Sequence, residues 1–353
     1  MNKFLSKKLS GLKPYVAGEQ PKDQKYIKLN TNENPYPPSK KVKEAVDMVN
    51  IDSLSLYPDP DSTDIKEAVA NLYNIQAENV FPSNSSDEIL ALAFMAFFQN
   101  DKPIAFPEIS YSFYPVYCDL YGIERNLIPL KDDFSIDIES FPLENGGIIF
   151  PNPNAPTGKD LSLLEIEKLV RNNPDSVVII DEAYVDFGAE TSVPLTSKYN
   201  NVLVIQTLSK SRSLAGLRVG FAIGSKELID CLNAVKNSFN SYTIDKIAIA
   251  ASVAAIKDTE HFNSCCQKII NTREWVTLQL RELGFKVLPS KANFILASPM
   301  DLYNAQDLYL NLKSKGILIR YWNQPKIKDW CRITVGTMFE METLVATIKE
   351  LLK

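Results

Sequence analysis

Four short polar segments of the chain combine residue types that could carry out chemistry. They are SNSSDE at 83–88, PNPNAPTG at 151–158, DEAY at 181–184 and TLSKSRSLAGLRVG at 207–220. Each has an ordinary explanation when taken singly, as a helix cap, a proline-rich turn, a strand end or a solvated basic loop. Their order and their residue types together indicate one shared site.

Lys210 is the centre of this pattern. It follows the apolar run NVLVIQTLS, which is typical of a buried strand. A lysine that forms a Schiff base must lose its proton, and a desolvated or cationic setting favours that loss. Asp181 ends another apolar run, where its carboxylate could hold a proton on the nitrogen of a pyridine-type electron sink. Tyr184 lies three residues further on, close enough to reach the phenolic oxygen of such a ring.

A phosphate group could be held around the same lysine. Thr207 and Ser209 flank Lys210, and Arg218 follows it, so hydroxyl and guanidinium donors are available for charge-assisted hydrogen bonds. A helix is predicted over 85–99, with Ser85 and Glu88 as a capping box. Its first turn, at Ser86 and Asp87, would offer free backbone N–H groups to an anion.

The elements that must position these residues follow from hydrophobic periodicity. Residues 1–38 are rich in Pro, Gly, Asn and Lys without sustained periodicity, which indicates an extended arm. Residues 39–240 alternate helical patterns with short β-branched runs, as in a mostly parallel sheet that is buried on both faces. Residues 241–353 read as a smaller α+β unit. We therefore expect an α/β protein with a large and a small domain.

Composition excludes several classes of function. The net charge of −5 argues against a broad basic face for nucleic acid. Five cysteines without CxxC spacing indicate neither a disulfide scaffold nor a zinc site, and a single histidine, His261, removes multi-histidine metal sites. No apolar run is long enough for a signal peptide or a membrane helix. We expect a cytoplasmic protein that binds small molecules and no metal, nucleic acid or membrane.

The four segments resemble those of the fold-type I (class II) aminotransferases, which use pyridoxal 5'-phosphate (PLP), and the likeness extends over nearly the whole chain. Within that group the sequence is most similar to the histidinol-phosphate aminotransferases. The resemblance implies a three-layer fold and the binding of PLP to Lys210. It implies phosphate contacts from Ser86, Asp87, Thr207, Ser209 and Arg218, ring contacts from Asp181 and Tyr184, and stacking by Tyr111, with Tyr114 as the alternative. Many relatives have Asn where this chain has Ala155, so Asn154 is the expected substitute.

The substrate residues are implied by KLNTNENPYPPS, YPDPDS, SKANF, GILIRYW and CRITVGT. By resemblance, Arg332 binds the α-carboxylate of glutamate and Arg320 binds the phosphate of histidinol phosphate. Tyr15 and Asn32 line the pocket, and Tyr57 reaches the cofactor site across the interface of a homodimer with shared active sites. The implied reaction, in histidine biosynthesis, converts histidinol phosphate and 2-oxoglutarate to imidazole acetol phosphate and glutamate.

Other functions remain open at this point. A threonine-phosphate decarboxylase or an aromatic aminotransferase would share the same cofactor residues. A regulatory module that retains the fold without catalysis is disfavoured, because no recognition domain or basic segment is appended. A nucleotide-dependent enzyme is weaker still, since neither GxGxxG nor a Walker loop is present.

Overall fold

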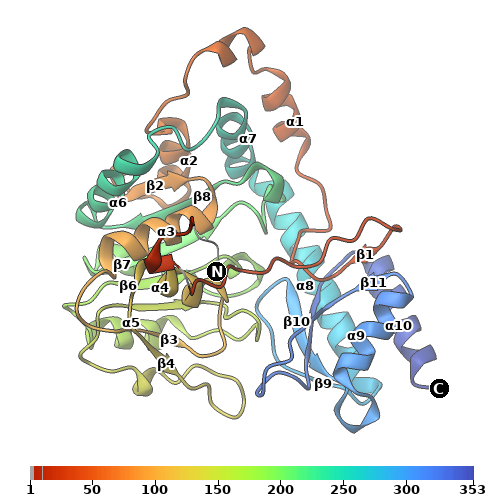
Figure 1. The fold of residues 1–353 in the computed structure, drawn as a ribbon. Coiled ribbons are helices and arrows are strands. Elements are labelled where there is room, and N and C mark those ends of the chain that lie inside the picture. The colour runs from red at the N-terminus through yellow and green to blue at the C-terminus, as the bar shows by residue number, and fades with distance from the viewer. Residues whose placement is uncertain (1–3, 10) are drawn as a thin grey trace.

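The computed structural model describes residues 4–9 and 11–353 and shows a large and a small sheet, each with its own helices (Figure 1). In the described part of the chain, the large sheet has seven strands in the order β2-β8-β7-β6-β5-β3-β4. Their bounds are β2 Val80–Ser83, β3 Ile104–Pro107, β4 Arg125–Ile128, β5 Ile148–Pro151, β6 Val178–Asp181, β7 Val202–Thr207 and β8 Gly220–Gly224. The pairs among β3 to β7 are parallel, and β8 runs antiparallel to both β2 and β7.

Three layers follow from the alternation of side chains along each strand. Ile148 and Phe150 of β5 pack in one core cluster, whereas Ile149 between them packs in a second cluster on the other face. The first cluster receives side chains from α1 (Lys40–Asp47), α2 (Thr63–Tyr73), α5 (Leu163–Arg171) and α7 (Lys246–Lys257). The second receives them from α3 (Ser85–Phe97), α4 (Phe113–Tyr121) and α6 (Lys226–Phe239). The predicted three-layer fold with a mostly parallel sheet is confirmed.

The small sheet is antiparallel, in the order β12-β13-β10-β9. Its strands and the helices beside it are α8 Thr259–Glu282, β9 Lys286–Val287, β10 Phe294–Ser298, α9 Ala305–Ser314, β12 Arg320–Tyr321, β13 Cys331–Thr334 and α10 Met338–Leu351. Between α9 and β12, β11 Ile317–Leu318 belongs to a separate two-stranded sheet. Short 3-10 helices occupy connections: Lys7–Leu9, Ile51–Ser55, Ala77–Asn79, Ile138–Ser140, Val185–Phe187, Val193–Ser197, Ala215–Leu217 and Met300–Leu302.

The N-terminal arm runs between the two sheets (Figure 1). It contains β1 (Ile27–Lys28), which pairs in parallel with β11. The Glu19 carboxylate accepts hydrogen bonds from Tyr309 and Lys313 of α9, so a second point ties the arm to the small sheet's helices. Residues 1–3 and 10, which belong to the predicted arm, lie outside the described residues.

The division into residues 1–38, 39–240 and 241–353 stays a prediction. α7 begins just beyond residue 240 and packs against α1 and α2, beside the large sheet. Within the described residues, no helix combines the length and the apolar character that crossing a membrane requires.

Candidate active site

A cavity of about 350 Å³ lies where the ends of the large-sheet strands, the arm and the small sheet meet. The predicted site residues that line it are Tyr15, Asn32, Ser86, Asp87, Tyr111, Asp181, Tyr184, Thr207, Ser209, Lys210, Arg218, Arg320 and Arg332. Asp181 and Thr207 are the last residues of the neighbouring parallel strands β6 and β7. The site therefore occupies the carboxyl edge of the sheet, where α/β proteins bind their ligands.

Asp181 is a buried carboxylate, with 4% of its surface exposed. One oxygen accepts a 2.9 Å hydrogen bond from the Tyr114 hydroxyl, and the other accepts one from the Ala183 backbone N–H. Burial raises the pKa of Asp181 to about 6, although both hydrogen bonds oppose that shift. A cation placed beside this carboxylate would stabilise its charged form.

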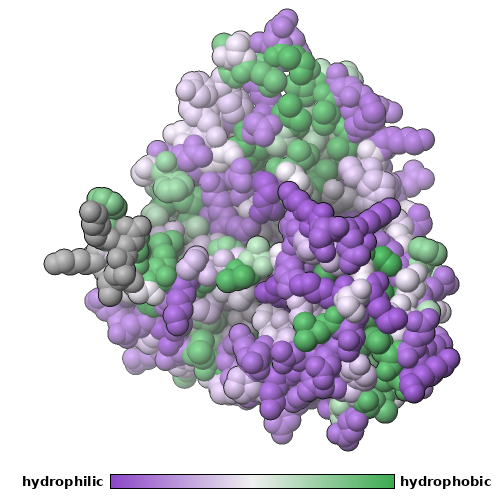
Figure 2. Space-filling view, turned by 45° about the vertical axis from the view of Figure 1, so that its right-hand side comes forward, coloured by the Kyte–Doolittle hydropathy of each residue, from purple (hydrophilic) through white to green (hydrophobic). Residues whose placement is uncertain are grey.

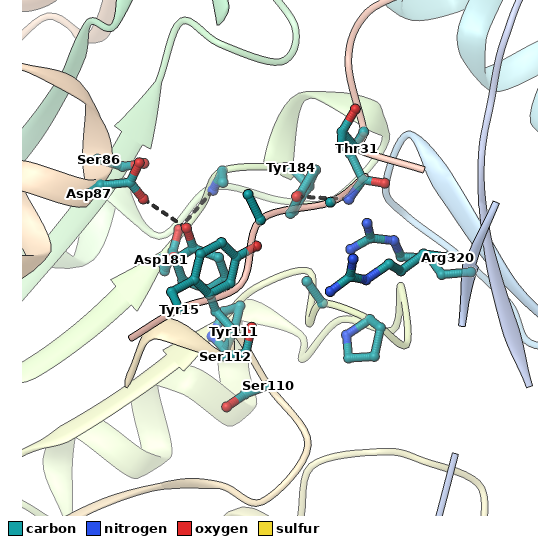
Figure 3. A pocket seen from close by; sticks show the side chains of 18 of the residues that line it. Tyr15, Thr31, Ser86, Asp87, Ser110, Tyr111, Ser112, Asp181, Tyr184 and Arg320 are labelled. Carbon is teal, nitrogen blue, oxygen red and sulfur yellow. Dashed lines mark hydrogen bonds between the residues drawn. The ribbon is translucent and has the colours of Figure 1, made fainter. Parts of the chain in front are cut away.

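The Lys210 amine points toward the arm. Its Nζ donates to the Thr31 carbonyl at 3.4 Å and lies 5.7 Å from the centre of the Tyr184 ring. The Tyr184 hydroxyl accepts a 2.9 Å hydrogen bond from Nδ2 of Asn32, as Figure 3 shows. Asn32 in turn is fixed by Thr334, which bonds both its backbone N–H and its side-chain oxygen. The lysine and its aromatic neighbour are thus held between the large sheet and the arm.

The expected phosphate donors gather at the start of α3. The Arg218 guanidinium pairs with the Asp87 carboxylate at 2.7 Å. The Tyr111 hydroxyl donates to the other oxygen of Asp87, and both side chains are labelled in Figure 3. The Thr207 hydroxyl donates to the Ser209 hydroxyl at 3.0 Å. With the backbone N–H groups of the first helical turn, these groups form a polar end of the cavity that suits a phosphate.

The predicted capping box of α3 is wrong. The helix begins at Ser85 as expected, but its N-cap is Asn84, and no side chain caps it. The Glu88 carboxylate instead accepts hydrogen bonds from the Asn84 N–H and the Ser83 hydroxyl, one residue earlier than the sequence pattern suggested. The hydrogen-bond donors to Glu88 therefore come from the end of β2 and the residue after it, and not from Ser85.

Gly220 allows α3 to begin so close to the sheet. A Cβ at this position would lie 2.6 Å from the Ser86 nitrogen and 2.9 Å from the Ser85 carbonyl carbon. Both are backbone atoms, so a side chain here would force the backbone itself to shift. Ser85 itself has φ 71°, in the left-handed region that non-glycine residues rarely adopt. The turn is therefore tightly constrained.

The other end of the cavity carries two arginines. Arg332 of β13 donates from Nη2 to the Asn30 carbonyl at 2.8 Å, while its buried Nε has no hydrogen-bond partner among the described residues. Desolvation lowers the pKa of Arg332. Arg320 of β12 lies on the same side, opposite Asp87 and Asp181 in Figure 3. This end suits an anionic substrate group.

Two predicted site residues lie elsewhere. Asn154 does not line the cavity, because its amide donates to the Ile109 carbonyl and to Thr157 inside the buried turn, and Ala155 faces the cavity in its place. Tyr57 is 78% exposed and stacks on Tyr242 at 4.5 Å between ring centres, outside this chain's cavity. Tyr114, the alternative to Tyr111, is fully buried behind Asp181.

Several lining residues were not predicted. Gln20, Thr31, Glu108, Trp322, Gln324 and Ile327 all border the cavity. Trp322 lies in GILIRYW, the segment that already indicated Arg320, so its position beside that arginine was the available signal. The others lie in loops, where no periodicity fixes the direction of a side chain.

The residues present fit PLP. The buried Asp181 has no cationic side chain in an ion pair with it among the residues that the structure describes, and it would face a protonated ring nitrogen. The donors around Arg218 would face the phosphate, and Lys210 borders the same cavity, with its amine 5.7 Å from the centre of the Tyr184 ring. No group of His, Cys, Asp and Glu in the described chain could hold a metal ion.

Comparisons with known proteins agree with this geometry. The family model for aminotransferase class I and II matches residues 24–348. Histidinol-phosphate aminotransferase from Clostridium botulinum (strain Okra / Type B1) is 52% identical, over 100% of this chain and 99% of that protein. The protein of the same name from Acinetobacter baumannii (strain SDF) is 55% identical, over 99% and 97% of the two chains.

Solved structures show the same fold at low sequence identity. Histidinol-phosphate aminotransferase from Sinorhizobium meliloti, in complex with pyridoxal-5'-phosphate, superposes with a TM-score of 0.86 at 22% identity, covering 93% of this chain and 92% of that one. The enzyme of that name from Clostridium acetobutylicum gives 0.85 at 21% identity, covering 92% and 99%.

The fold, the lysine and the buried carboxylate thus define an aminotransferase, and the chain belongs to the class I and II family. Within it, full-length identity above 50% places the chain among the histidinol-phosphate aminotransferases.

Proposed function

We propose that this protein transfers the amino group of L-histidinol phosphate to 2-oxoglutarate, giving imidazole acetol phosphate and L-glutamate, with PLP as its cofactor. The names of its full-length relatives support the substrates. The observation that carries the proposal is one cavity with a lysine and a buried carboxylate at one end and two arginines at the other. This reaction belongs to histidine biosynthesis.

The cofactor would be held at the carboxyl edge of the large sheet. Asp181 would contact the ring nitrogen, Tyr184 the phenolic oxygen, and Tyr111 would pack against the ring. The phosphate contacts would come from Ser86, Asp87, Thr207, Ser209 and Arg218. When bound, PLP withdraws electrons from the substrate Cα and so makes its proton removable.

Lys210 would move that proton. Its Nζ lies in the cavity wall beside Tyr184, and as a free amine it would take the proton from the substrate Cα. The negative charge of Asp181 would hold the positive charge at the ring nitrogen throughout. Asn32 would fix Tyr184 through the hydrogen bond between them.

The arginines would bind the two substrates in turn. Arg332, whose planar guanidinium suits a carboxylate, would bind the α-carboxylate of glutamate or 2-oxoglutarate. Arg320 would bind the phosphate of histidinol phosphate, and Tyr15 of the arm would cover the substrate. Tyr15 stacks on Phe113 at 4.2 Å, which fixes this part of the arm at the cavity.

We further propose a homodimer with shared active sites. Met48, Ile51, Leu56 and Tyr57 are exposed apolar residues around α1 and the segment that follows it. Figure 2 shows apolar side chains gathered near the top of the molecule, where Figure 1 places this segment. A second copy would cover these residues and place its Tyr57 at this chain's cavity. Light scattering of the wild type and Tyr57→Phe would measure the mass of both.

One set of assays tests the proposed reaction. Holoenzyme is supplied with histidinol phosphate and 2-oxoglutarate, and glutamate formation is measured. Phenylalanine as donor, compared by kcat/KM, tests the aromatic alternative. Release of carbon dioxide from threonine phosphate tests the decarboxylase alternative. Absence of glutamate from the first mixture, with turnover in either of the others, would replace the proposal.

A further inference from the structure

The two arginines of the substrate end are direct cross-strand neighbours. In the antiparallel pair β12 and β13, Arg320 stands opposite Arg332. Like charges that face each other across a sheet destabilise it, and burial increases the cost. Among the residues that the structure describes, no ion pair includes either guanidinium. The Glu19 carboxylate attracts Arg320 only from beyond ion-pair distance, so a direct contact of another kind is needed to offset the repulsion.

Trp322 is the side chain that both guanidiniums contact. The Cζ of Arg320 lies 5.3 Å from the centre of the Trp322 ring, and the Cζ of Arg332 lies 5.2 Å from it. An indole face attracts a cation through its quadrupole, more strongly than any other aromatic side chain does. Unlike a carboxylate, it stabilises the cation without occupying the N–H donors. Arg332 gives Nη2 to the Asn30 carbonyl, but its buried Nε has no partner among the described residues and is available to a ligand.

The ring of Trp322 is fixed by its own loop. Residues 322–330 cross from the small sheet to the large one, where Trp322 and Ile327 pack against the first core cluster. Lys326 pairs with Glu108, which also lines the cavity, and Trp330 packs edge-on against Phe134 at 5.1 Å. The indole is therefore anchored to the large-sheet side while the arginines stand on the small sheet.

We propose that Trp322 is a specificity-determining residue: its indole holds Arg320 and Arg332 as two separate anion sites with open donors, so that one cavity accepts both a phosphate-bearing and a carboxylate-bearing substrate. This inference rests on the proposed function for the identity of the two substrates. The presence of two anion sites is inferred from the two arginines and Trp322 alone, whatever the substrates are. A chain with an aliphatic side chain at this position would bind both anions more weakly.

The test compares three variants of the PLP-loaded enzyme. Trp322→Leu removes the indole face, Trp322→Phe retains a smaller face, and Trp275→Leu makes the same exchange on α8, outside the cavity and outside this loop. Calorimetric titration measures the binding of 2-oxoglutarate and of inorganic phosphate. We expect Trp322→Leu to weaken both by about tenfold, as for a desolvated cation–π contact, and Trp322→Phe to recover part of the loss. Trp275→Leu should stay within about twofold.

Kinetics add a second readout. Trp322→Leu should raise the KM for both substrates and leave kcat nearly unchanged, because Lys210 and Asp181 are untouched. The proposal is overturned if Trp322→Leu binds both anions as the wild type does, or if Trp275→Leu is equally impaired. It is also overturned if Trp322→Phe recovers nothing. A wild type that binds both anions but does not use histidinol phosphate would refute the proposed function, and the titrations would still decide the role of Trp322.

Discussion

The two ends of the cavity are built in different ways. At the cofactor end the polar side chains have partners within the protein: Asp181 with Tyr114, and Asp87 with both Arg218 and Tyr111. They stand on strands and a helix of the large sheet. At the substrate end Arg320 stands on the edge strand β12 and Arg332 on its neighbour β13 in the small sheet, and the Nε of Arg332 is left without a partner among the described residues.

The difference matches the role proposed for each end. A cofactor that stays in place is served best by side chains whose positions are set in advance by their neighbours. A substrate end that takes up one compound and then another needs donors that no internal acceptor occupies. We therefore expect changes at the cofactor end to lower kcat, and a change to either arginine of the substrate end to raise KM for one substrate at a time.

The largest effect should come from Lys210→Ala. Loss of the proton-transferring amine should lower kcat by about a thousandfold or more, because a positioned general base contributes about 10²–10⁴. Glutamate formation from histidinol phosphate measures it. Lys198→Ala, at an exposed ion pair away from the cavity, is the control and should behave as the wild type. Substantial turnover by the Lys210 variant would remove this residue from the mechanism.

Asp181 should make PLP binding depend on pH. Its pKa is raised to about 6, so the carboxyl is mostly neutral below that pH and charged above it. Because burial favours the neutral carboxyl, Asp181 contributes most to the stability of the PLP-free protein at low pH. This contribution to stability is lost as the pH rises through about 6 and the carboxyl becomes charged. A protonated ring nitrogen favours the charged form, so PLP should stabilise the protein more as pH increases.

Melting temperatures with and without PLP, at about pH 5 and about pH 7.5, measure this difference. The gain in Tm on adding PLP should be larger at the higher pH. Asp181→Asn should make the gain in Tm on adding PLP the same at both pH values. It should also lower kcat by about a hundredfold, since the ring nitrogen loses its anionic partner. If the gain in Tm on adding PLP increases with pH equally in the variant, a group other than Asp181 causes the pH dependence.

Arg332→Lys should affect the substrate end alone. A lysine keeps the charge but loses the planar pair of donors, which costs about 1.5–3 kcal/mol, or about 10–100-fold in KM for 2-oxoglutarate and glutamate. The KM for histidinol phosphate should change much less, and Arg320→Lys should show the opposite selectivity. If both variants impair both substrates equally, the two arginines do not act as separate sites.

The smallest effect should come from Tyr114→Phe. Its hydroxyl lowers the pKa of Asp181 through their hydrogen bond, so removing it should raise that pKa further. The pH at which PLP begins to stabilise the protein should shift upward, while kcat at neutral pH falls by about fivefold or less. Tyr117→Phe, which removes a hydroxyl bonded to the Asp87 carbonyl, is the matched control. An unchanged pH profile would contradict the role of this bond.

The sequence predicted the large sheet and most of its site because strand periodicity and strand ends are local signals. The runs that end at Asp181 and Thr207 are β-branched and continuous, so both the strands and the edge where they end could be predicted. The start of α3 was predicted, but its cap was not, because Glu88 turns back to Ser83 and Asn84 across the strand end.

The rest depends on contacts between distant segments. The pairing of β1 with β11 and the register that sets Arg320 against Arg332 join parts of the chain that no local pattern connects. Asn154 was expected in the cavity because it is adjacent to Ala155, but the turn directs its amide inward to Ile109. Trp322 was overlooked because an aromatic residue beside an arginine is also an ordinary packing pattern.

Gly220 has a consequence for how this protein can vary over generations. Its missing side chain is what leaves room for the backbone of Ser85 and Ser86, yet the residue lines no part of the cavity. A side chain at this position would push the start of α3 outward. The backbone N–H groups of its first turn would then move away from the proposed phosphate position. We expect natural selection to preserve glycine at this position as strictly as it preserves the reactive lysine.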